Sequence, residues 1–202
     1  MIVTISNQYG AGAVAIGHRV AARLGYALVD RELPIIVAKR MRTTPEEVEA
    51  VEDVGRSLGE RLLSSLEMST PEVNAAHFGE SFDEEYLREV QEAVREYAAR
   101  GDTVVIGRAA ALILGRRPDV LRVFMHAPRD WRIENVARDL ALERATAQAE
   151  VDRIDRARKA HLRDWYDAEF GNPKHYDLSI DTAAFGEEGS AALIVAAVAA
   201  RS

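Results

Sequence analysis

Short apolar runs alternate with long helical patterns along this chain, and that order constrains its fold more than any other feature. The first run is followed at once by a turn with Gly10 and Gly12, and then by a helical pattern that continues to Leu24. Strands that alternate with helices are typical of a parallel sheet covered on both faces. We therefore predict a three-layer α/β fold with about five strands, at residues 2–6, 26–29, 103–106, 120–126 and 176–180.

The size and composition of the chain suit one domain, predicted over residues 1–202. Of its 202 residues, 48% are hydrophobic and 29% charged, so it can bury a core without disulfides or a structural metal. The chain contains no cysteine, which excludes disulfide scaffolds, thiol catalysis and metal sites with cysteine ligands. The five histidines show no metal-ligand spacing, so we expect no protein metal site. The absence of cysteine also fits a reducing, cytoplasmic location.

Charge and hydropathy argue against two kinds of partner. With 26 Lys+Arg against 33 Asp+Glu the net charge is −7, whereas binding to a nucleic-acid backbone needs a broad basic surface. The acidity is concentrated in residues 41–100, and the rest of the chain is close to neutral. The amino terminus lacks the basic region of a signal peptide. The most apolar run, 191–200, is about half the ~20 residues of a membrane span. We expect a buried helix there, and neither a nucleic-acid nor a membrane partner.

The turn after the first predicted strand contains Gly10, Ala11 and Gly12, followed by Ala13 and Val14. A glycine-rich turn between a strand and a helix can bind phosphate through backbone N–H groups and the helix N-terminus. A P-loop has lysine directly after the second glycine, for the phosphates, and then a serine or threonine for Mg²⁺. Ala13 and Val14 supply neither group. The loop therefore predicts phosphate binding with charge compensation from elsewhere, and a closely packed turn without a ligand is the alternative.

Charged residues follow two other predicted strands. Arg108 comes after a glycine at the end of the third strand, where parallel sheets place their ligands. Its guanidinium suits bidentate contact with a phosphate or carboxylate, and the alternative is a surface ion pair. Asp30 ends the second strand, at the same edge of the sheet. It is a candidate substrate contact, and the alternative is a cap for the next helix.

A helical segment near residue 155 repeats charged residues at a spacing of three. Asp152, Asp155 and Arg158 lie on adjacent turns of one helix face, and the last two are able to pair. The alternative is a solvated ion pair without further function. The aromatic residues of this part of the chain are interpreted as packing residues: Trp131, Trp165, Tyr166 and Phe170.

Taken in order, these motifs resemble the cytidylate kinase-like family, a branch of the P-loop nucleoside monophosphate kinases. The resemblance spans nearly the whole chain, and the ordered set is more specific than any single motif. It rests on six stretches: TISNQYGAG (4–12), LGYALVDREL (24–33), VVIGRAA (104–110), VFMHAP (123–128), DRAR (155–158) and NPKHYDLSIDT (172–182).

The resemblance implies a P-loop NTPase-type fold that transfers a phosphoryl group from ATP, with Mg²⁺, to a nucleoside monophosphate. CMP or dCMP is the expected acceptor, so the expected partners are small-molecule nucleotides. It implies that residues 10–14 bind ATP phosphates and that 41–100 form an acidic helical insert of the monophosphate-binding type. The substrate-binding residues that it implies are Asp30, Arg108, Asp155 and Arg158.

The resemblance also implies a lid-like region at about residues 129–150. Lid arginines neutralise charge on the transferring phosphoryl group, and this segment contains Arg132, Arg138 and Arg144. We take Arg132 and Arg138 as the catalytic candidates. Because the arginines alternate with acidic residues, an exposed, salt-bridged helix is the alternative.

Two departures from the family pattern keep other functions open. Ala13 and Val14 replace the P-loop lysine and hydroxyl, and Val151 stands where the family has an arginine ahead of the first aspartate of the pattern Asp152, Asp155 and Arg158. One alternative is a catalytically impaired nucleotide-binding module that acts as a sensor or binds a partner. Another is a kinase for a different small phosphorylated or hydroxyl acceptor. The sequence makes no prediction of the oligomeric state.

Overall fold

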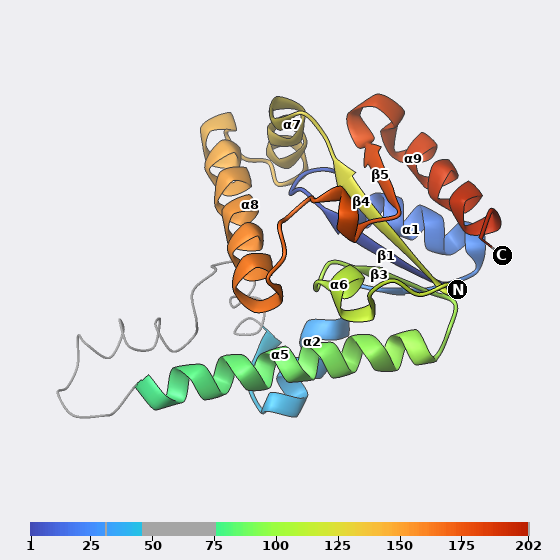
Figure 1. The fold of residues 1–202 in the computed structure, drawn as a ribbon. Coiled ribbons are helices and arrows are strands. Elements are labelled where there is room, and N and C mark those ends of the chain that lie inside the picture. Colours follow the sequence, from blue (N-terminus) through green and yellow to red (C-terminus); the bar gives the residue numbers. More distant parts are fainter. Residues whose placement is uncertain (31, 46–75, 202) are drawn as a thin grey trace.

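A five-stranded parallel sheet forms the centre of the computed structural model, which describes residues 1–30, 32–45 and 76–201 (Figure 1). The strand order is β2-β3-β1-β4-β5, and every neighbouring pair is parallel. All strands therefore end at one edge, where ligands bind in open α/β sheets. Their bounds are β1 Ile2–Asn7, β2 Ala27–Val29, β3 Thr103–Ile106, β4 Val120–His126 and β5 Leu178–Asp181.

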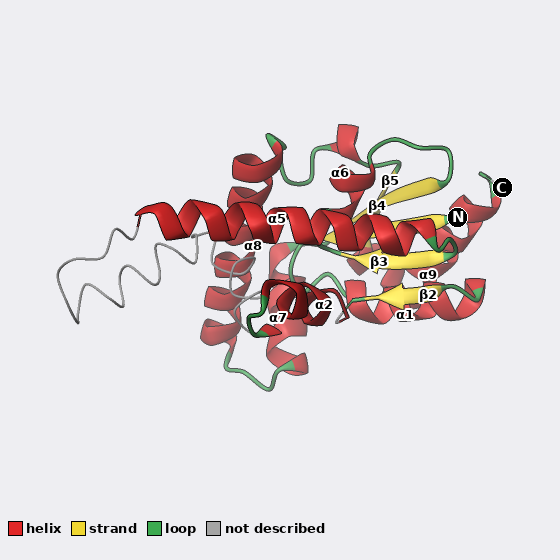
Figure 2. Ribbon diagram, turned by 90° about the horizontal axis from the view of Figure 1, so that it is seen from below, coloured by secondary structure: helices red, strands yellow, loops and turns green. Residues whose placement is uncertain are grey.

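Two layers of helices cover the sheet. One consists of α1 (Ala13–Leu24) and α9 (Thr182–Ala199), and the other of α2 (Glu32–Met41), α5 (Ala76–Ala99) and α6 (Ala110–Leu114). Successive residues of a strand point to opposite faces, so Val3 and Ile5 pack in the α1/α9 cluster and Ile2 packs in the other. In Figure 2, α5 crosses the face of the sheet that is turned to the viewer. The predicted three-layer α/β fold is confirmed.

The helices α7 (Arg129–Asp139) and α8 (Arg144–Tyr166) pack against each other at the carboxyl edge of the sheet (Figure 1). The side chain of Tyr9, from the loop after β1, packs partly buried against the apolar cluster between them. The region predicted as lid-like, about residues 129–150, contains α7 and the first part of α8. The four fully packed members of the cluster are Ile133, Val136, Ala147 and Val151.

The five predicted strands are present with small shifts at their ends. β3 and β4 have the predicted bounds, whereas β5 begins two residues later than predicted. The reason is a short 3-10 helix, Pro173–His175, which Tyr176 terminates before the strand begins. Of the predicted acidic insert, only residues 41–45 and 76–100 lie among the described residues, and these contain the end of α2 and the whole of α5.

The carboxyl-terminal helix is longer and less buried than the sequence predicts. α9 begins at Thr182, and its Ala191 and Ile194 are buried against the sheet while Phe185 is 53% exposed. By length and mean hydropathy it is long and apolar enough to cross a membrane, as the core helices of many proteins are. Here it contributes to the main core and contacts α1, β4 and β5. Its acidic residues also pair with α1, as in the Arg19–Glu187 contact of 2.9 Å.

Candidate functional site

A cavity of about 790 Å³ opens at the carboxyl edge of the sheet. Its walls come from the ends of β1, β2 and β3, the glycine loop after β1, the turn before α6, and the facing sides of α7 and α8. A volume of this size is typical of sites for small organic ligands. Nine of the eleven predicted site residues line it: Asp30, Arg108, Arg138, Arg158 and the loop residues Gly10, Ala11, Gly12, Ala13 and Val14.

The glycine loop leads directly into the first turn of α1. Gly10 and Gly12 have φ angles of +81° and +78°, in the left-handed region that glycine adopts without a steric cost. Gly12 is the N-cap of α1 and brings no capping side chain. The N–H groups of a first helical turn have no partner within the helix, so they and the helix dipole favour an anion. The loop thus has the backbone geometry of a phosphate site.

Gly10 is also required by close packing. A Cβ at this position would lie 2.7 Å from the carbonyl oxygen of Arg132 and 3.0 Å from the Val136 side chain. The amide of Asn135 donates to the carbonyl oxygen of Gly10 at 3.2 Å. Helix α7 therefore approaches the loop so closely that only glycine fits between them.

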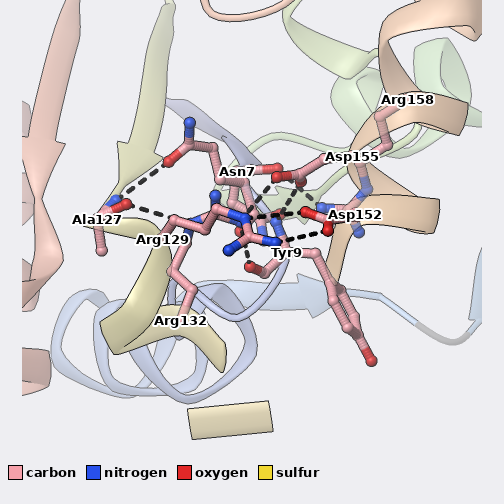
Figure 3. Close-up of polar contacts among 9 residues, drawn as sticks. Asn7, Tyr9, Ala127, Arg129, Arg132, Asp152, Asp155 and Arg158 are labelled. Carbon is pink, nitrogen blue, oxygen red and sulfur yellow. Dashed lines mark hydrogen bonds and ion pairs between the residues drawn. The ribbon is translucent and has the colours of Figure 1, made fainter. Parts of the chain in front are cut away.

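Arg132 holds the loop from the side of α7, as Figure 3 shows. Its side chain is buried, and its Nε donates to the carbonyl of Ala127 at 3.1 Å. Its Nη1 donates to the carbonyl of Tyr9 at 2.9 Å and to Oδ2 of Asp155 at 2.7 Å. Oδ1 of Asp155 accepts the backbone N–H of Tyr9 at 2.9 Å. One buried ion pair thus binds both the backbone N–H and the backbone carbonyl of Tyr9.

These contacts give Arg132 a different setting from the lid arginine predicted by the sequence. The residue lies in the first turn of α7, and its guanidinium points under the glycine loop, outside the residues that line the cavity. Asp155 likewise engages Arg132 and Tyr9, contacts that its spacing to Arg158 did not indicate. The geometry therefore favours a positioning role for this pair.

The other two arginines of the predicted lid are exposed. Arg138 lines the cavity, but its side chain is 68% exposed and forms an ion pair with its neighbour Asp139 at 2.9 Å. Arg144 binds Asp130 at 2.8 Å and Glu134 at 3.4 Å across the two helices. These surface pairs match the salt-bridged alternative that the alternating charges suggested.

Arg158, from α8, lies against the strand that leads into the glycine loop. Its Nη1 donates to the carbonyl of Asn7 at 2.8 Å, and its guanidinium carbon lies 5.7 Å from the centre of the Tyr9 ring. On the outer side of the same helix, Asp152 forms an exposed pair with Arg129 at 2.6 Å. The hydrogen bond from Arg129 lowers the pKa of the Asp152 carboxyl. Asp152 therefore lies at the surface, whereas Arg158 lines the cavity.

The turn that carries Arg108 has an uncommon backbone conformation. Gly107, Arg108 and Ala109 have successive φ angles of +72°, +55° and +51°. Residues other than glycine adopt this region at a cost and cluster at functional sites when the surrounding structure holds them there. The turn is anchored by the N–H of Gly107, which donates to the carbonyl of Ile5 at 2.8 Å. Asp30 reaches the same cavity from the end of β2, the strand beside β3.

One wall of the cavity is aromatic, which the sequence did not predict. Phe170 and Tyr176 line it, and both rings pack on Phe124, with centroid distances of 5.5 and 4.9 Å. Burial raises the pKa of the Tyr176 hydroxyl, which also hydrogen-bonds to the side chain of Ser6. The segment from 172 to 182 matched the family pattern, but nothing in it showed that Tyr176 faces the site. Trp131, interpreted as a packing residue, lines the cavity as well.

The donor set fits a nucleotide phosphate better than a metal held by the protein alone. Among the residues that the structure describes, no group of three histidine, aspartate or glutamate side chains is placed to hold a metal ion. Val14 stands where a hydroxyl would bind Mg²⁺. Mg²⁺ usually keeps several waters and binds through substrate phosphates and few carboxylates, so it would enter this site together with a nucleotide.

The comparisons with known proteins point to one family. A family model described as the cytidylate kinase-like family matches residues 2–184. The chain is similar to the cytidylate kinase of Haloarcula marismortui, with 25% identity over 98% of this chain and 89% of that protein. It is similar to the cytidylate kinase of Methanopyrus kandleri, with 22% identity over 98% of this chain and 93% of that protein.

Solved structures show the same fold. An uncharacterized protein from Eubacterium ventriosum superposes with a TM-score of 0.69, at 16% identity over 98% of each chain. Shikimate kinase from Acinetobacter baumannii, solved in complex with shikimate, gives a TM-score of 0.54 at 12% identity. That superposition covers 98% of this chain and 93% of the shikimate kinase chain. The fold is therefore that of the P-loop kinases.

Proposed function

The chain belongs to the cytidylate kinase-like family, and from this premise we propose that it transfers the γ-phosphoryl group of ATP to a nucleoside monophosphate. CMP or dCMP is the proposed acceptor, in keeping with the names of the cytidylate kinases that the chain resembles. The observation that carries the proposal is that the glycine loop, Arg108 and Arg158 line one cavity. A phosphate-binding loop and two arginines on separate elements suit a site for two phosphorylated ligands.

In the proposed reaction, an oxygen of the acceptor phosphate forms a bond to the γ-phosphorus of ATP. The bond from that phosphorus to the bridging oxygen breaks, and the products are ADP and a nucleoside diphosphate. The loop residues 10–14 would bind the ATP phosphates, while Mg²⁺ would neutralise part of their charge. Phosphoryl transfer depends on positioning and on electrostatic stabilisation, so no protein nucleophile is needed.

The acceptor is proposed to lie on the β2 and β3 side of the cavity. Arg108 would bind its phosphate, held in place by the strained turn before α6. Asp30 lines the same side and would contact a hydroxyl or base amine of the acceptor. Arg138, at the exposed end of α7, is proposed to contact the transferring group when the site is filled, and Arg132 to position the loop. The insert at 41–100 is proposed to complete the acceptor site.

A second candidate function is nucleotide binding without turnover. Ala13 is an apolar residue with 4% exposure at the position of the P-loop lysine, and Val14 brings no hydroxyl. A chain with these substitutions retains the backbone N–H groups of the loop, and it would bind a nucleotide as a sensor or as a partner-binding module. Phosphorylation of another small acceptor is the third candidate, since Asp30 at the cavity also suits a hydroxyl group.

An assay with a panel of acceptors separates these candidates. The full chain is incubated with ATP, Mg²⁺ and one of CMP, dCMP, UMP, AMP or GMP, and the products are separated by anion-exchange chromatography. We expect ADP and CDP or dCDP in equal amounts. ATP binding without ADP formation for any acceptor would support the binding module. If no nucleotide binds, both the kinase and the binding module are wrong. A cytoplasmic location and the lack of a nucleic-acid partner stay predictions from the sequence.

A further inference from the structure

We propose that Arg158 supplies the positive charge that the glycine loop lacks at Ala13. The phosphates of the bound nucleotide would then be held by a cation from α8 instead of one from the loop itself. This inference rests on the proposed function, since it concerns the same nucleotide site. It assigns Arg158 to the phosphates of ATP, in addition to the acceptor contact that the family resemblance implies.

The need for such a charge follows from the loop. The helix dipole of α1 places about half a unit of positive charge at its N-terminus, whereas a triphosphate carries several negative charges. The residues that enter the first turn of α1, Ala13 and Val14, are both apolar. Beyond the charge that Mg²⁺ would neutralise, we expect compensation from another element that lines the same cavity. Among the residues that the structure describes, three arginines do so: Arg108, Arg138 and Arg158.

The placement of these three arginines distinguishes them. Arg138 is 68% exposed and pairs with Asp139 at the outer end of α7. Arg108 lies on the turn after β3, a strand that pairs with β2 on one side and with β1 on the other. Arg158 is held against the loop strand itself, through the carbonyl of Asn7 at 2.8 Å and the ring of Tyr9 at 5.7 Å. Its guanidinium is thus held beside the residues that lead directly into the loop proposed to bind phosphate.

The rest of α8 fixes this position. Asp155, almost one helical turn before Arg158, binds the N–H of Tyr9 at 2.9 Å and the buried side chain of Arg132 at 2.7 Å. Figure 3 shows these residues gathered around the loop from α7 and α8. The helix that carries Arg158 is therefore tied to the loop at two adjacent turns. A guanidinium has five N–H donors in a planar fork, so it can hold a carbonyl and bind phosphate oxygens together.

The test is a charge-rescue experiment on the full chain. Isothermal titration calorimetry measures the Kd of MgATP and of inorganic tripolyphosphate for wild type, Arg158→Ala, Ala13→Lys and the double variant. Loss of a charged hydrogen bond corresponds to about ten- to a hundredfold weaker binding, which we expect for Arg158→Ala with both probes. Ala13→Lys returns a cation to the cavity wall. We therefore expect the double variant to bind both probes with a Kd at least about tenfold lower than that of Arg158→Ala.

Two control variants separate charge from structure. Arg163→Ala removes another arginine of α8, one that is 71% exposed and pairs with Asp164, and it should leave both Kd values within about twofold. Arg158→Lys keeps the charge while it alters the contact with Asn7, and it should bind tripolyphosphate more tightly than Arg158→Ala does. Thermal unfolding of every variant shows whether the fold has been retained.

Several other outcomes overturn the inference. If Arg158→Ala leaves the Kd of tripolyphosphate unchanged and raises only the KM of the acceptor, Arg158 binds the acceptor alone. If binding falls and Ala13→Lys does not restore it, or if Arg158→Lys binds as weakly as Arg158→Ala, the role of Arg158 is structural. Absence of tripolyphosphate binding to wild type also overturns the inference. Wild type that binds tripolyphosphate but shows no turnover contradicts the kinase proposal and leaves the assignment of Arg158 intact.

Discussion

Arg132 and Asp155 form a buried ion pair, with 2.7 Å between Nη1 and Oδ2, that joins α7 to α8 beside the glycine loop. The same two helices are joined again by Arg129 and Asp152, 2.6 Å apart but at the surface. The exposed fractions of the arginine side chains are 6% for Arg132 and 45% for Arg129. One helix pair therefore contains a buried and an exposed ion pair that can be compared directly.

We predict that Arg132→Ala lowers the free energy of unfolding by about 3 kcal/mol, because it leaves the buried carboxylate of Asp155 without its cation. Urea denaturation of the full chain measures this change. Arg129→Ala is the matched control and should have little effect, since exposed pairs are screened by water and salt. Equal losses for the two variants would contradict the assignment of a positioning role to the buried pair.

We predict that Gly10→Ala destabilises the chain by about 2 kcal/mol and weakens tripolyphosphate binding at least tenfold. The new Cβ would meet the carbonyl oxygen of Arg132 at 2.7 Å, and overpacking of this kind typically costs about 1–3 kcal/mol. Gly25→Ala is the control, because Gly25 also has a positive φ, +68°, but has open space around it. A loss of binding in both variants would show that backbone strain, and not contact with α7, determines the effect.

We predict that Asp177 makes the stability of the chain depend on pH in the acid range. Burial of its carboxyl would raise the pKa, but hydrogen bonds from Arg122 and Arg201 outweigh this effect and lower it from 3.8 to about 2. The contribution is thus fully present above about pH 4 and is lost as the pH falls through 2. Allowing for its partial exposure, it amounts to about 1–2 kcal/mol.

Urea denaturation of wild type and of Asp177→Asn between pH 5 and pH 2 measures this contribution. The difference between their free energies of unfolding should shrink toward pH 2, when the wild-type carboxyl becomes protonated. If the difference stays constant over this range, the ion pair with Arg122, at 2.8 Å, makes no pH-dependent contribution to the free energy of unfolding.

We predict that Arg108→Ala raises the KM of the acceptor about tenfold or more and changes the KM of ATP less than twofold. Arg108 lines the cavity from the turn after β3, a different element from the helix N-terminus that is proposed to bind the ATP phosphates. Loss of a charged hydrogen bond has an effect of this size. Steady-state kinetics with each substrate varied in turn measure both values. Equal increases in the two KM values would count against the assigned role of Arg108.

Most of the fold was predictable because its signals are local. Continuous apolar runs such as 103–106 and 120–126 became strands with the predicted bounds, since buried parallel strands need apolar residues on both faces. The glycines at positions 10 and 12 adopt positive φ angles, as a turn that approaches a phosphate requires. The ends of elements were less predictable: α9 extends to Thr182, well before the apolar run that predicted a helix.

The partners of the arginines were not predictable, because an arginine in a helix can reach neighbours in several directions. Arg132 and Arg138 are six residues apart on α7 and looked alike as lid residues. The structure buries the first under the glycine loop and leaves the second 68% exposed. Spacing along α8 indicated a pair between Asp155 and Arg158, yet the carboxylate binds Tyr9 and Arg132, which approach from other elements.

The sequence by itself determined the three-layer fold, the family and the absence of a lysine at Ala13. These follow from residue order and from side-chain chemistry, which need no knowledge of contacts. Only the tertiary structure decided which charges surround the loop, because strand order and helix packing bring α7 and α8 against residues more than 100 positions earlier in the chain. Long-range packing therefore places Arg158 beside the loop and Arg132 beneath it, and it separates the cation proposed to bind phosphate from the one that holds the loop in shape.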